Sequence, residues 1–567
     1  MPSGRRCIVK LRFPGCRYVN LPSAEVALIL VTAVFNELLF FRHSVFGGFD
    51  RISADLWDGR LMMANLEHWH RVWMGDANWQ NPIFFYPIRG VLGYNDGLLF
   101  YGAIYSLFRT AGADWFAAYE LVNMTIKLIG FLAFFALVRH LLRVRLHYAL
   151  LGSSIFFQLN STAAHLGHSQ LLSVAFVPLM LILLYSLVMA TTLGEKGKIW
   201  FFALAGIVTY EIWLMSSFYM AWFFFLFLTI SAVLFAMRAG PASLRRYAGS
   251  LKASAGTLLG IAFIAALASI PFVQTYMPTA RETGMHDIST MRGFSGSPLD
   301  VLNVGEGNLL YGKAFDHLRV LLSGRAAVGE ERSTGFTPLL LLLFGLGLVY
   351  CWKKPIGIDQ RIVRAVLLAV VLLWMASFRW GPFLPWDYLF DYFPGAKAIR
   401  VPPRFQIFVG FFVVAAATVY LDRARLFDRP ALFAVLALVL LAEQYNTGYG
   451  WGITREKENW IFVDIPAPRA DCKSFFILRP EQRPDLSPGI RDYYLHNLDA
   501  MILAERFNLP TLNGAESQHP RDWDLFRPLE SDYLDRVLSY ARAMGVRHGL
   551  CSLDIPTRRW ALVVSMP

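Results

Sequence analysis

The segment Ser217–Met237 reads SFYMAWFFFLFLTISAVLFAM and contains no charged side chain. A helix of about 20 apolar residues is long enough to cross the hydrocarbon core of a bilayer. Ten further apolar runs of comparable length occur in the chain, at 23–41, 115–138, 146–162, 170–192, 198–215, 254–273, 336–352, 362–378, 405–421 and 430–446. The sequence therefore predicts an α-helical polytopic membrane protein with about eleven transmembrane helices.

The composition of the chain is also that of a membrane protein. Of its 567 residues, 56% are hydrophobic and 17% are charged, whereas soluble domains carry about 25% charged residues. In a soluble protein the net charge of +12 would point to nucleic acid, but here the basic residues lie mainly between the apolar runs. Such residues are typical of topology signals and headgroup contacts, so no nucleic-acid partner is predicted.

Basic residues mark alternate loops along the chain. They occur in the N-terminal arm and at 139–145, 196–198, 238–252, 353–361 and 423–429. By the positive-inside rule these short loops, and the N-terminus, are predicted to be cytoplasmic. The opposite side then receives the long segments 42–114, 274–335, 379–404 and 447–567. This assignment requires that Leu98–Phe108 does not cross, and its short length predicts an interfacial helix.

Beyond residue 446 the composition changes to charges, prolines and short β-like runs. Trp460–Ile465, Phe475–Leu478 and Trp560–Val564 predict strands, and Ser531–Ala543 predicts an amphipathic helix. We therefore predict a transmembrane domain over residues 1–446 and a small extracytoplasmic α/β domain over residues 447–567.

This C-terminal domain contains two cysteines, Cys472 and Cys551. An oxidising compartment would allow them to form a disulfide, and two unpaired buried thiols are the alternative.

The first long outer loop concentrates carboxylates and aromatic residues near the membrane. Ala54–Trp73 has helical periodicity, and Asp55 and Asp58 would share one face of that helix. Aromatic side chains can seat a lipid and a sugar, while a carboxylate can take the proton of an acceptor hydroxyl. The alternative for these carboxylates is local ion pairing with Arg51 or Arg60.

The sequence gives no indication of a metal or a nucleotide. His68 and His70 are two residues apart, so on a helix they point in different directions, and we predict no metal site. The chain contains no Walker motif, HExxH or GxSxG. No cofactor and no soluble nucleotide-sugar donor are therefore predicted.

Cations precede one of the predicted spans. Arg400 and Arg404 bracket Val401-Pro402-Pro403, directly before the apolar run that begins at Phe405. Two guanidinium groups at the start of a helix form a suitable phosphate site, and anchoring to lipid headgroups is the alternative. Arg281 is a weaker candidate for the same role.

Several motifs resemble those of a known superfamily. The first outer loop carries Asp58-Gly59-Arg60, Leu66-Glu67-His68 and Leu92-Gly93-Tyr94-Asn95-Asp96, and later segments carry Gly329-Glu330-Glu331 and the run Pro394–Phe405. In these motifs the chain resembles the GT-C superfamily of polyprenyl-phosphate-sugar-dependent glycosyltransferases, and most closely a bacterial branch of it. The resemblance extends over nearly the whole chain.

The resemblance implies which residues carry the chemistry. In that superfamily the general base is an acidic residue of the first outer loop, and Asp58 and Asp50 fit this position. We prefer Asp58, because it lies in the Asp-Gly-Arg motif. Asp96 would be a second acidic residue that binds substrate, with Trp57 and Tyr94 as aromatic contacts.

The implied activity is transfer of a hexosyl or pentosyl group from a polyprenyl-phosphate donor to a glycan, lipid or protein acceptor of the cell envelope. It would take place on the outer face of a bacterial cytoplasmic membrane, and a single displacement would invert the anomeric centre. A transporter or flippase for a lipid-linked glycan is an alternative, because Glu37 and Lys127 lie in predicted spans. A non-catalytic envelope assembly protein is a third reading.

Overall fold

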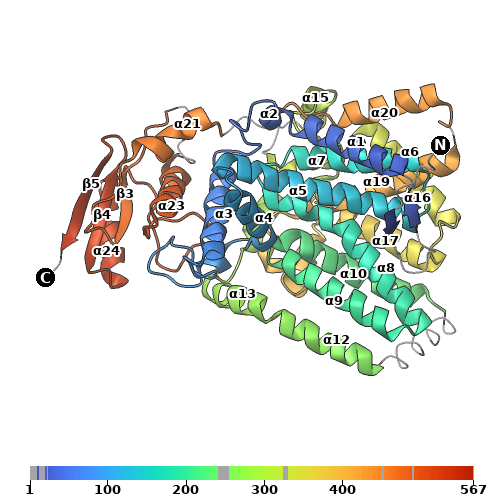
Figure 1. Cartoon of the computed structure of the whole chain (residues 1–567), viewed down its shortest axis with the longest axis horizontal. Helices are drawn as coiled ribbons and strands as arrows, with labels where there is room; N and C mark the ends of the chain where they lie inside the picture. The colour runs from blue at the N-terminus through green and yellow to red at the C-terminus, as the bar shows by residue number, and fades with distance from the viewer. Residues whose placement is uncertain are drawn as a thin grey trace, which may run out of the picture.

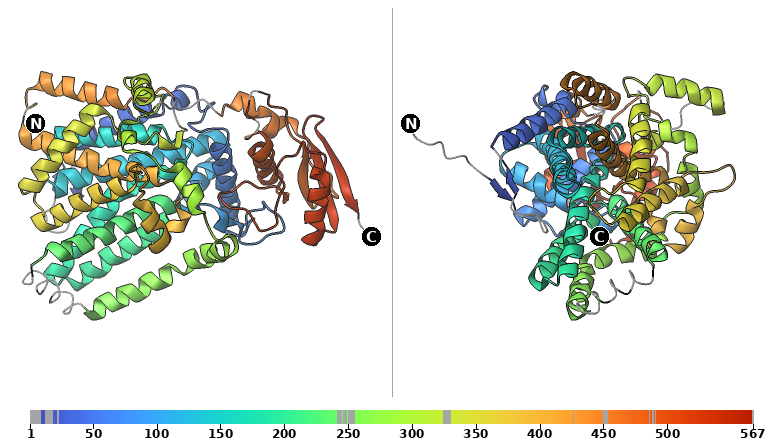
Figure 2. Two further views of the ribbon diagram at one scale, coloured as in Figure 1. Left: turned by 180° about the vertical axis from the view of Figure 1, so that it is seen from behind. Right: turned by 90° about the vertical axis from the view of Figure 1, so that its right-hand side faces the viewer.

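The computed structural model describes residues 9–11, 19–21, 23–240, 245, 249, 255–323, 330–425, 427–448, 453–484, 486–487, 489 and 491–565. Its long axis runs from a bundle of apolar helices to a small C-terminal domain, with the first outer loop between them (Figure 1). The left view in Figure 2 shows the same succession of parts from behind. Most of the N-terminal arm and of the basic loop 238–252 lies outside the described residues, so the orientation in the membrane stays a prediction.

Six described helices are long and apolar enough to cross a bilayer. They are α1 (Ser23–Phe40), α5 (Trp115–Ala136, continued by the π-helical turn Leu137–Leu141), α8 (Phe176–Leu193, preceded by the 3-10 turn Ser169–Ala175), α9 (Lys196–Leu214), α10 (Phe218–Arg238) and α19 (Phe405–Ala424, preceded by the 3-10 turn Pro402–Arg404). A seventh span forms if α12 (Ala255–Ala268) and α13 (Ile270–Thr283), which meet at a bend of 49°, cross together. The chain is thus a polytopic membrane protein.

The other four predicted spans are helical but short. Their helices are α6 (Leu146–Gln158, followed by the short α7, Asn160–Ala163), α16 (Pro338–Lys353), α17 (Gln360–Ala376) and α20 (Pro430–Gln444). Each of the four has fewer than the 18 residues expected of a straight crossing. Eleven crossings are therefore not confirmed by the helix lengths.

The loops between the long helices carry shorter elements. In the first outer loop these are α2 (Arg42–Val45), α3 (Asp58–Met74), the 3-10 turn η1 (Val91–Tyr94) and α4 (Leu99–Thr110). Later loops contain α14 (Ile288–Phe294), α15 (Gly312–Ser323), α18 (Trp386–Tyr392) and the 3-10 turns at Pro298–Leu302, Glu330–Arg332 and Ala396–Ala398. The predicted helix at 54–73 corresponds to α3, and the predicted short helix at 98–108 corresponds to α4. Near the N-terminus, Val9–Leu11 and Val19–Leu21 pair as antiparallel strands β1 and β2.

The C-terminal domain contains one sheet with the strand order β3-β4-β5. Strands β3 (Ser474–Arg479) and β4 (His548–Asp554) are parallel, and β5 (Arg559–Ser565) is antiparallel to β4. The helical elements are α21 (Arg455–Asn459), the π-helical turns Trp460–Asp464 and Arg491–Leu495, α23 (His496–Phe507) and α24 (Tyr533–Ala543). A disulfide joins Cys472, just before β3, to Cys551 in β4.

The strand predicted at Trp460–Ile465 is wrong, because this segment continues α21 as a π-helical turn. A short apolar run of this kind fits a strand and a buried helical turn equally well. The central strand β4 was not predicted, because its sequence HGLCSLD begins with residues of weak strand preference.

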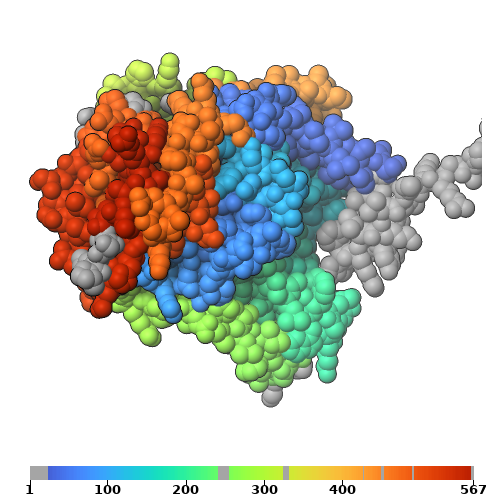
Figure 3. Space-filling model, turned by 60° about the vertical axis from the view of Figure 1, so that its left-hand side comes forward, coloured from blue at the N-terminus to red at the C-terminus, as the bar shows by residue number. Residues whose placement is uncertain are grey.

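The first outer loop belongs to both parts of the molecule. The large apolar core of the helix bundle includes Leu66 and Trp69 of α3. The core of the C-terminal domain includes Ala64, Phe84 and Phe85 of the same loop. Figure 3 shows the C-terminal domain seated directly against the first outer loop, drawn in blue. Residues of this loop are therefore held from two sides.

Candidate active site

Asp55 organises the start of α3. Its Oδ1 accepts hydrogen bonds from the backbone N–H groups of Trp57 (2.9 Å) and Gly59 (3.3 Å). The first backbone N–H groups of a helix have no acceptor within the helix, so a nearby carboxylate can accept their hydrogen bonds. The Oδ2 atom lies against Gly167, where an added Cβ would come within 2.2 Å of it. Asp55 therefore fixes α3 beside the segment that carries His168.

Asp58, in the first turn of α3, begins a network of charged side chains. Its Oδ2 lies 3.0 Å from Nδ1 of His168. The other ring nitrogen, Nε2, lies 2.7 Å from a terminal nitrogen of Arg404 and 3.5 Å from Oε1 of Glu331. Arg404 also donates to both carboxylate oxygens of Glu331, at 2.9 and 2.7 Å. Four segments that are distant in the sequence thus meet at one point.

His168 determines the charge balance of this network. The 2.7 Å contact between Arg404 and Nε2 is a hydrogen bond only while Nε2 is unprotonated, because an arginine cannot accept a hydrogen bond; Nδ1–H then donates to Asp58. Burial and the Arg404 charge both lower the pKa of His168, but the carboxylates of Asp58 and Glu331 outweigh them and raise it to about 9. At pH 7 the imidazole is therefore protonated, its Nε2–H faces Glu331, and His168 and Arg404 share the charge of that carboxylate.

The two carboxylates of the network are held in their ionised form. Burial would raise the pKa of Asp58, but the ion pair with His168 and the charge of Arg404 lower it below its usual range. Burial likewise opposes ionisation of Glu331, yet Arg404 and His168 lower its pKa strongly. A third of the Asp58 side-chain surface remains accessible, so Asp58 borders open space while keeping its charge.

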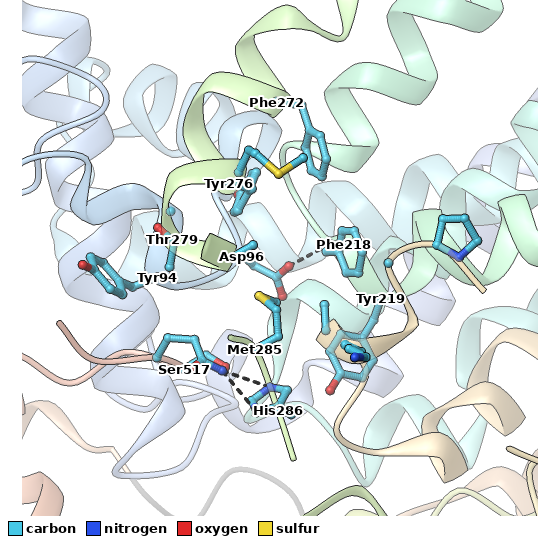
Figure 4. Close-up of a pocket in the computed structure, with 18 of the residues that line it drawn as sticks. Tyr94, Asp96, Phe218, Tyr219, Phe272, Tyr276, Thr279, Met285, His286 and Ser517 are labelled. Atoms are coloured by element: carbon cyan, nitrogen blue, oxygen red, sulfur yellow. Dashed lines mark hydrogen bonds between the residues drawn. The ribbon is translucent and has the colours of Figure 1, made fainter. Parts of the chain in front are cut away.

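Asp96 lines a cavity of about 510 Å³ next to this network. Figure 4 shows its carboxylate inside the cavity, with one oxygen accepting a 2.7 Å hydrogen bond from the backbone N–H of Phe218. Burial raises the pKa of Asp96 to about 6, against the opposing effects of that hydrogen bond and of Arg404 and His168. A carboxylate with this pKa accepts a proton more readily than Asp58 does.

Tyr219 connects the cavity with the charged network. It lines the cavity, and the Arg404 guanidinium lies 5.2 Å from the centre of its ring. Its hydroxyl accepts a 2.8 Å hydrogen bond from the backbone N–H of Arg400. The loop before α19 is thereby fastened to the start of α10.

The cavity has an apolar side and a polar side. The apolar side is formed by α13 and by the segment that follows α18, and includes Phe272, Val273, Tyr276, Met277 and Phe393. The polar side combines Ser517 and Gln518 of the C-terminal domain with His286 and Lys397. Figure 4 shows Phe272 and Tyr276 on one side of Asp96 and Ser517 and His286 on the other.

The Gln518 and His286 side chains meet across the cavity's polar side. The Gln518 amide nitrogen lies 3.1 Å from Nδ1 of His286. Burial and the Arg400 charge lower the pKa of His286 to about 4, so this imidazole is neutral at pH 7. Ser517, Gln518 and the neutral His286, with Lys397 and Asp391 also in the lining, offer donors and acceptors that suit a ligand rich in hydroxyl groups.

Four of the predicted site residues meet around this centre: Asp58 and Arg404 in the charged network, and Asp96 and Tyr94 in the cavity lining. Arg400 contributes its backbone N–H to Tyr219, while its guanidinium lies over the Phe294 ring.

Three other predicted residues lie away from the centre. Asp50 is mostly exposed, pairs with Arg455 at 3.0 Å and lines a separate cavity of about 620 Å³. Arg281 is exposed on α13. Trp57 is half-buried and packs against the core of the C-terminal domain. Asp50 follows the first span closely in the sequence, but its side chain pairs with Arg455 of α21 and does not face the centre.

The sequence did not reveal two important contacts. Glu331 is the partner that neutralises Arg404, and its only sequence signal was the Gly-Glu-Glu motif. Gln518 and His286 carried no motif, because they become neighbours only when the C-terminal domain folds against the membrane part.

Within the described residues, one group of side chains has the spacing of metal ligands: Asp471, Cys472 and Cys551. The two cysteine sulfurs are joined in the disulfide, so they do not offer thiolate ligands.

Together, the fold and the site define a polytopic membrane protein whose polar centre lies where the first outer loop, the helix bundle and the C-terminal domain meet. No protein-family model and no curated protein match the chain. Among solved structures it is similar to the arabinofuranosyltransferase AftD from Mycobacteria, with 14% identity and a TM-score of 0.45. That alignment covers 86% of this chain and 32% of AftD, so the chain spans about a third of that protein's length.

Two other solved structures show a comparable likeness. The Archaeoglobus fulgidus oligosaccharyltransferase in its apo form has 11% identity and a TM-score of 0.45, over 93% of this chain and 69% of that one. ArnT from Cupriavidus metallidurans, bound to undecaprenyl phosphate, has 10% identity and a TM-score of 0.35, over 86% of this chain and 85% of ArnT. These values describe a loose likeness of fold and assign no function, so the functional proposal rests on the residues of the site.

Proposed function

We propose that the protein is a membrane glycosyltransferase that moves a sugar from a polyprenyl-phosphate donor to an acceptor hydroxyl on the outer side of the membrane. The observation that carries this proposal is the position of Asp96. Its carboxylate lies between an apolar wall at the membrane side and a polar wall at the C-terminal domain, beside a network that contains Arg404. This arrangement suits one lipid-borne and one hydroxyl-bearing substrate.

The proposed reaction is a single displacement. Asp96 takes the proton of the acceptor hydroxyl, and the acceptor oxygen forms a bond to the anomeric carbon. The bond from that carbon to the phosphate oxygen breaks, and its electron pair leaves with the phosphate. Lys397, which lines the cavity, provides positive charge for the phosphate, and Arg400 and Arg404 lie behind the cavity lining in the same loop. Attack from the opposite face inverts the anomeric centre.

Asp96 replaces Asp58 as our preferred base. Asp58 has the lower pKa, because the ion pair with His168 stabilises its charge. A strongly stabilised carboxylate is a weak base, whereas a carboxylate with a raised pKa is matched to proton transfer near neutral pH. Burial raises the pKa of Asp55 to about 6 as well, but its oxygens are occupied by the start of α3 and by Gly167, whereas Asp96 lines the cavity. Asp58 is assigned the task of holding His168 and Arg404 in place.

The apolar wall is assigned to the isoprenoid chain of the donor. It lies on α13, the second half of the bent helix pair, which brings Phe272 and Tyr276 to the cavity. The proposal names the acceptor and the sugar only by class. The acceptor is a hydroxyl-bearing glycan, lipid or protein of the cell envelope, and the sugar is a hexose or pentose.

The test is complementation of a strain that lacks the gene, with cell-envelope glycans read by mass spectrometry. Wild type, Asp96→Asn, Asp58→Asn and Asp76→Asn are expressed at equal membrane levels. Asp76 is an exposed carboxylate of the same outer loop and serves as the matched control. We expect a sugar to be missing in the deletion strain, to return with wild type and Asp76→Asn, and to stay missing with Asp96→Asn.

Two results would contradict the proposal. Full restoration by Asp96→Asn removes Asp96 as the base. Complete glycans that accumulate on their lipid carrier in the deletion strain would identify a transporter. The buried Lys127 of α5 and the half-buried Glu37 of α1 would then be tested for that role.

A further inference from the structure

Two of the buried polar contacts between the C-terminal domain and the first outer loop lie next to carboxylates of the site. The first point is Arg60, two residues after Asp58 on α3. The second is Glu516, which binds Asn95, the residue directly before Asp96. Both contacts join parts of the chain that are about 400 residues apart, so neither is a consequence of local structure.

Arg60 is fastened to two helices of the C-terminal domain. Its Nε and one terminal nitrogen donate to Oε2 of Glu458 in α21, at 3.0 and 2.6 Å, and its other terminal nitrogen donates to Asp499 in α23. The three side chains are almost completely buried, with accessible fractions of 1%, 2% and 0%. A guanidinium that is displaced from these contacts would leave buried carboxylates unpaired, which is costly. The ion pairs therefore fix both the position and the orientation of Arg60.

The residue between Asp58 and Arg60 is a glycine for a steric reason. A Cβ on Gly59 would come within 2.8 Å of Cδ1 of Ile453 and 2.6 Å of the Ala54 methyl group. The first turn of α3 therefore lies directly against the chain that leads into the C-terminal domain. Each residue of the Asp58-Gly59-Arg60 motif has a separate contact: Asp58 with His168, Gly59 with Ile453, and Arg60 with the buried carboxylates.

Glu516 holds the other carboxylate from the same side. It is 6% exposed, and its two oxygens accept hydrogen bonds from the amides of Asn65 (3.0 Å) and Asn95 (2.6 Å). Two residues later, the backbone N–H of Gln518 donates to the carbonyl of Tyr94 at 3.0 Å. The segment from Glu516 to Gln518 thus binds Tyr94 and Asn95, the two residues that directly precede Asp96.

We infer that the C-terminal domain positions two carboxylates of the active site, with Arg60 as the positioning residue for Asp58 and Glu516 as the positioning residue for Asp96. This inference rests on the proposed transferase function and assigns the domain a part in catalysis. The simpler reading is that these contacts only dock the domain. A third contact on α3 separates the two readings, because Arg71 binds the buried Glu505 at 3.1 Å, near the opposite end of the helix from Asp58.

The experiment uses the full-length protein in lipid vesicles, with a panel of polyprenyl-phosphate-linked hexoses and pentoses as donors. For the donor that the wild type uses, kcat and KM are measured for Arg60→Met, Arg60→Lys and Arg71→Met, together with thermal midpoints. A misplacement of about 1 Å in an active site can cost about 100-fold in rate, even when the substituted residue does not touch the reacting atoms. We therefore expect kcat to fall about 100-fold in Arg60→Met with little change in donor KM, partial recovery in Arg60→Lys, and a nearly unchanged kcat in Arg71→Met.

Glu516→Gln provides an independent test if Arg60→Met does not fold. The amide keeps the shape of the side chain but replaces one acceptor oxygen with a donor, so it cannot accept from both asparagines. We expect a fall in kcat of about tenfold at an unchanged thermal midpoint. Equal losses in Arg60→Met and Arg71→Met, in proportion to their loss of stability, would overturn the positioning role, as would a wild-type kcat in Glu516→Gln. A wild type that uses no donor of the panel refutes the proposed function itself, and this inference with it.

Discussion

The pH dependence of transfer tests the role of Asp96 quantitatively. Burial in the cavity raises the pKa of this carboxyl from its ordinary value of 3.8 to about 6. At about 1.4 kcal/mol per unit, this shift corresponds to about 3 kcal/mol in favour of the protonated form. A base must be ionised to accept a proton, so activity is lost as the pH falls through the folded-state pKa.

The expected profile follows from this value. With a pKa of about 6, about nine-tenths of the Asp96 carboxyls are ionised at pH 7 and about one-tenth at pH 5, so kcat/KM falls nearly tenfold between these values. With the ordinary pKa, more than nine-tenths would remain ionised at pH 5, and the rate would hardly change. The two pKa values for Asp96 therefore predict clearly different rates at pH 5, and a single pH profile distinguishes them.

The assay measures initial rates of sugar transfer in reconstituted vesicles, at donor concentrations below KM, from pH 4.5 to pH 8. Each sample is also returned to pH 7 to show that the loss is reversible. A rate that stays constant down to pH 5 would refute the assignment of the base to Asp96, and only a reversible loss counts as titration of that carboxyl group.

Three further outcomes are expected. In His168→Gln the loss of a positive charge near Asp96 should move the acidic limb of the same profile to higher pH, and an unmoved limb would contradict the coupling. Gly59→Ala should lower the thermal midpoint through overpacking worth about 1–3 kcal/mol, whereas Gly197→Ala, in α9 with no neighbour within 4 Å, should not lower it. Cys472 and Cys551 should react with a maleimide only after reduction, and replacing both by serine should cost about 2–5 kcal/mol of domain stability; labelling without reductant would contradict the disulfide.

The positions of the apolar helices were predictable because span length and hydropathy are local properties of a sequence. Every predicted span contains a helix in the part of the chain that the structure describes. The number of crossings could not be predicted in the same way, because helices such as α6 and α20 are shorter than their apolar runs. Their ends are set by contacts with other segments, as at Gln444, whose side chain binds Asn160 and Thr337.

The site was predictable only in part, for a similar reason. The first outer loop, Asp96 and Arg404 were indicated by their composition and motifs. The choice between Asp50 and Asp58 could not be made from spacing, because both follow the first span closely. It depends on which partner each side chain meets after folding: Arg455 for Asp50 and His168 for Asp58.

The carboxyl groups of Asp58 and Asp96 differ in pKa because their surroundings differ. Asp58 faces His168 and Arg404, and these favour its ionised form. Asp96 lies in a cavity with a large apolar wall, and burial disfavours its ionised form. Environments that separate two pKa values in this way separate two chemical roles: one group keeps its charge throughout, and the other gains and loses a proton. A charge that persists can hold the cations that meet a leaving phosphate, and a group that titrates near neutral pH can take the acceptor proton. Asp58 and Asp96 are therefore assigned different roles because Asp96 lines the cavity, whereas Asp58 lies in the charged network beside it.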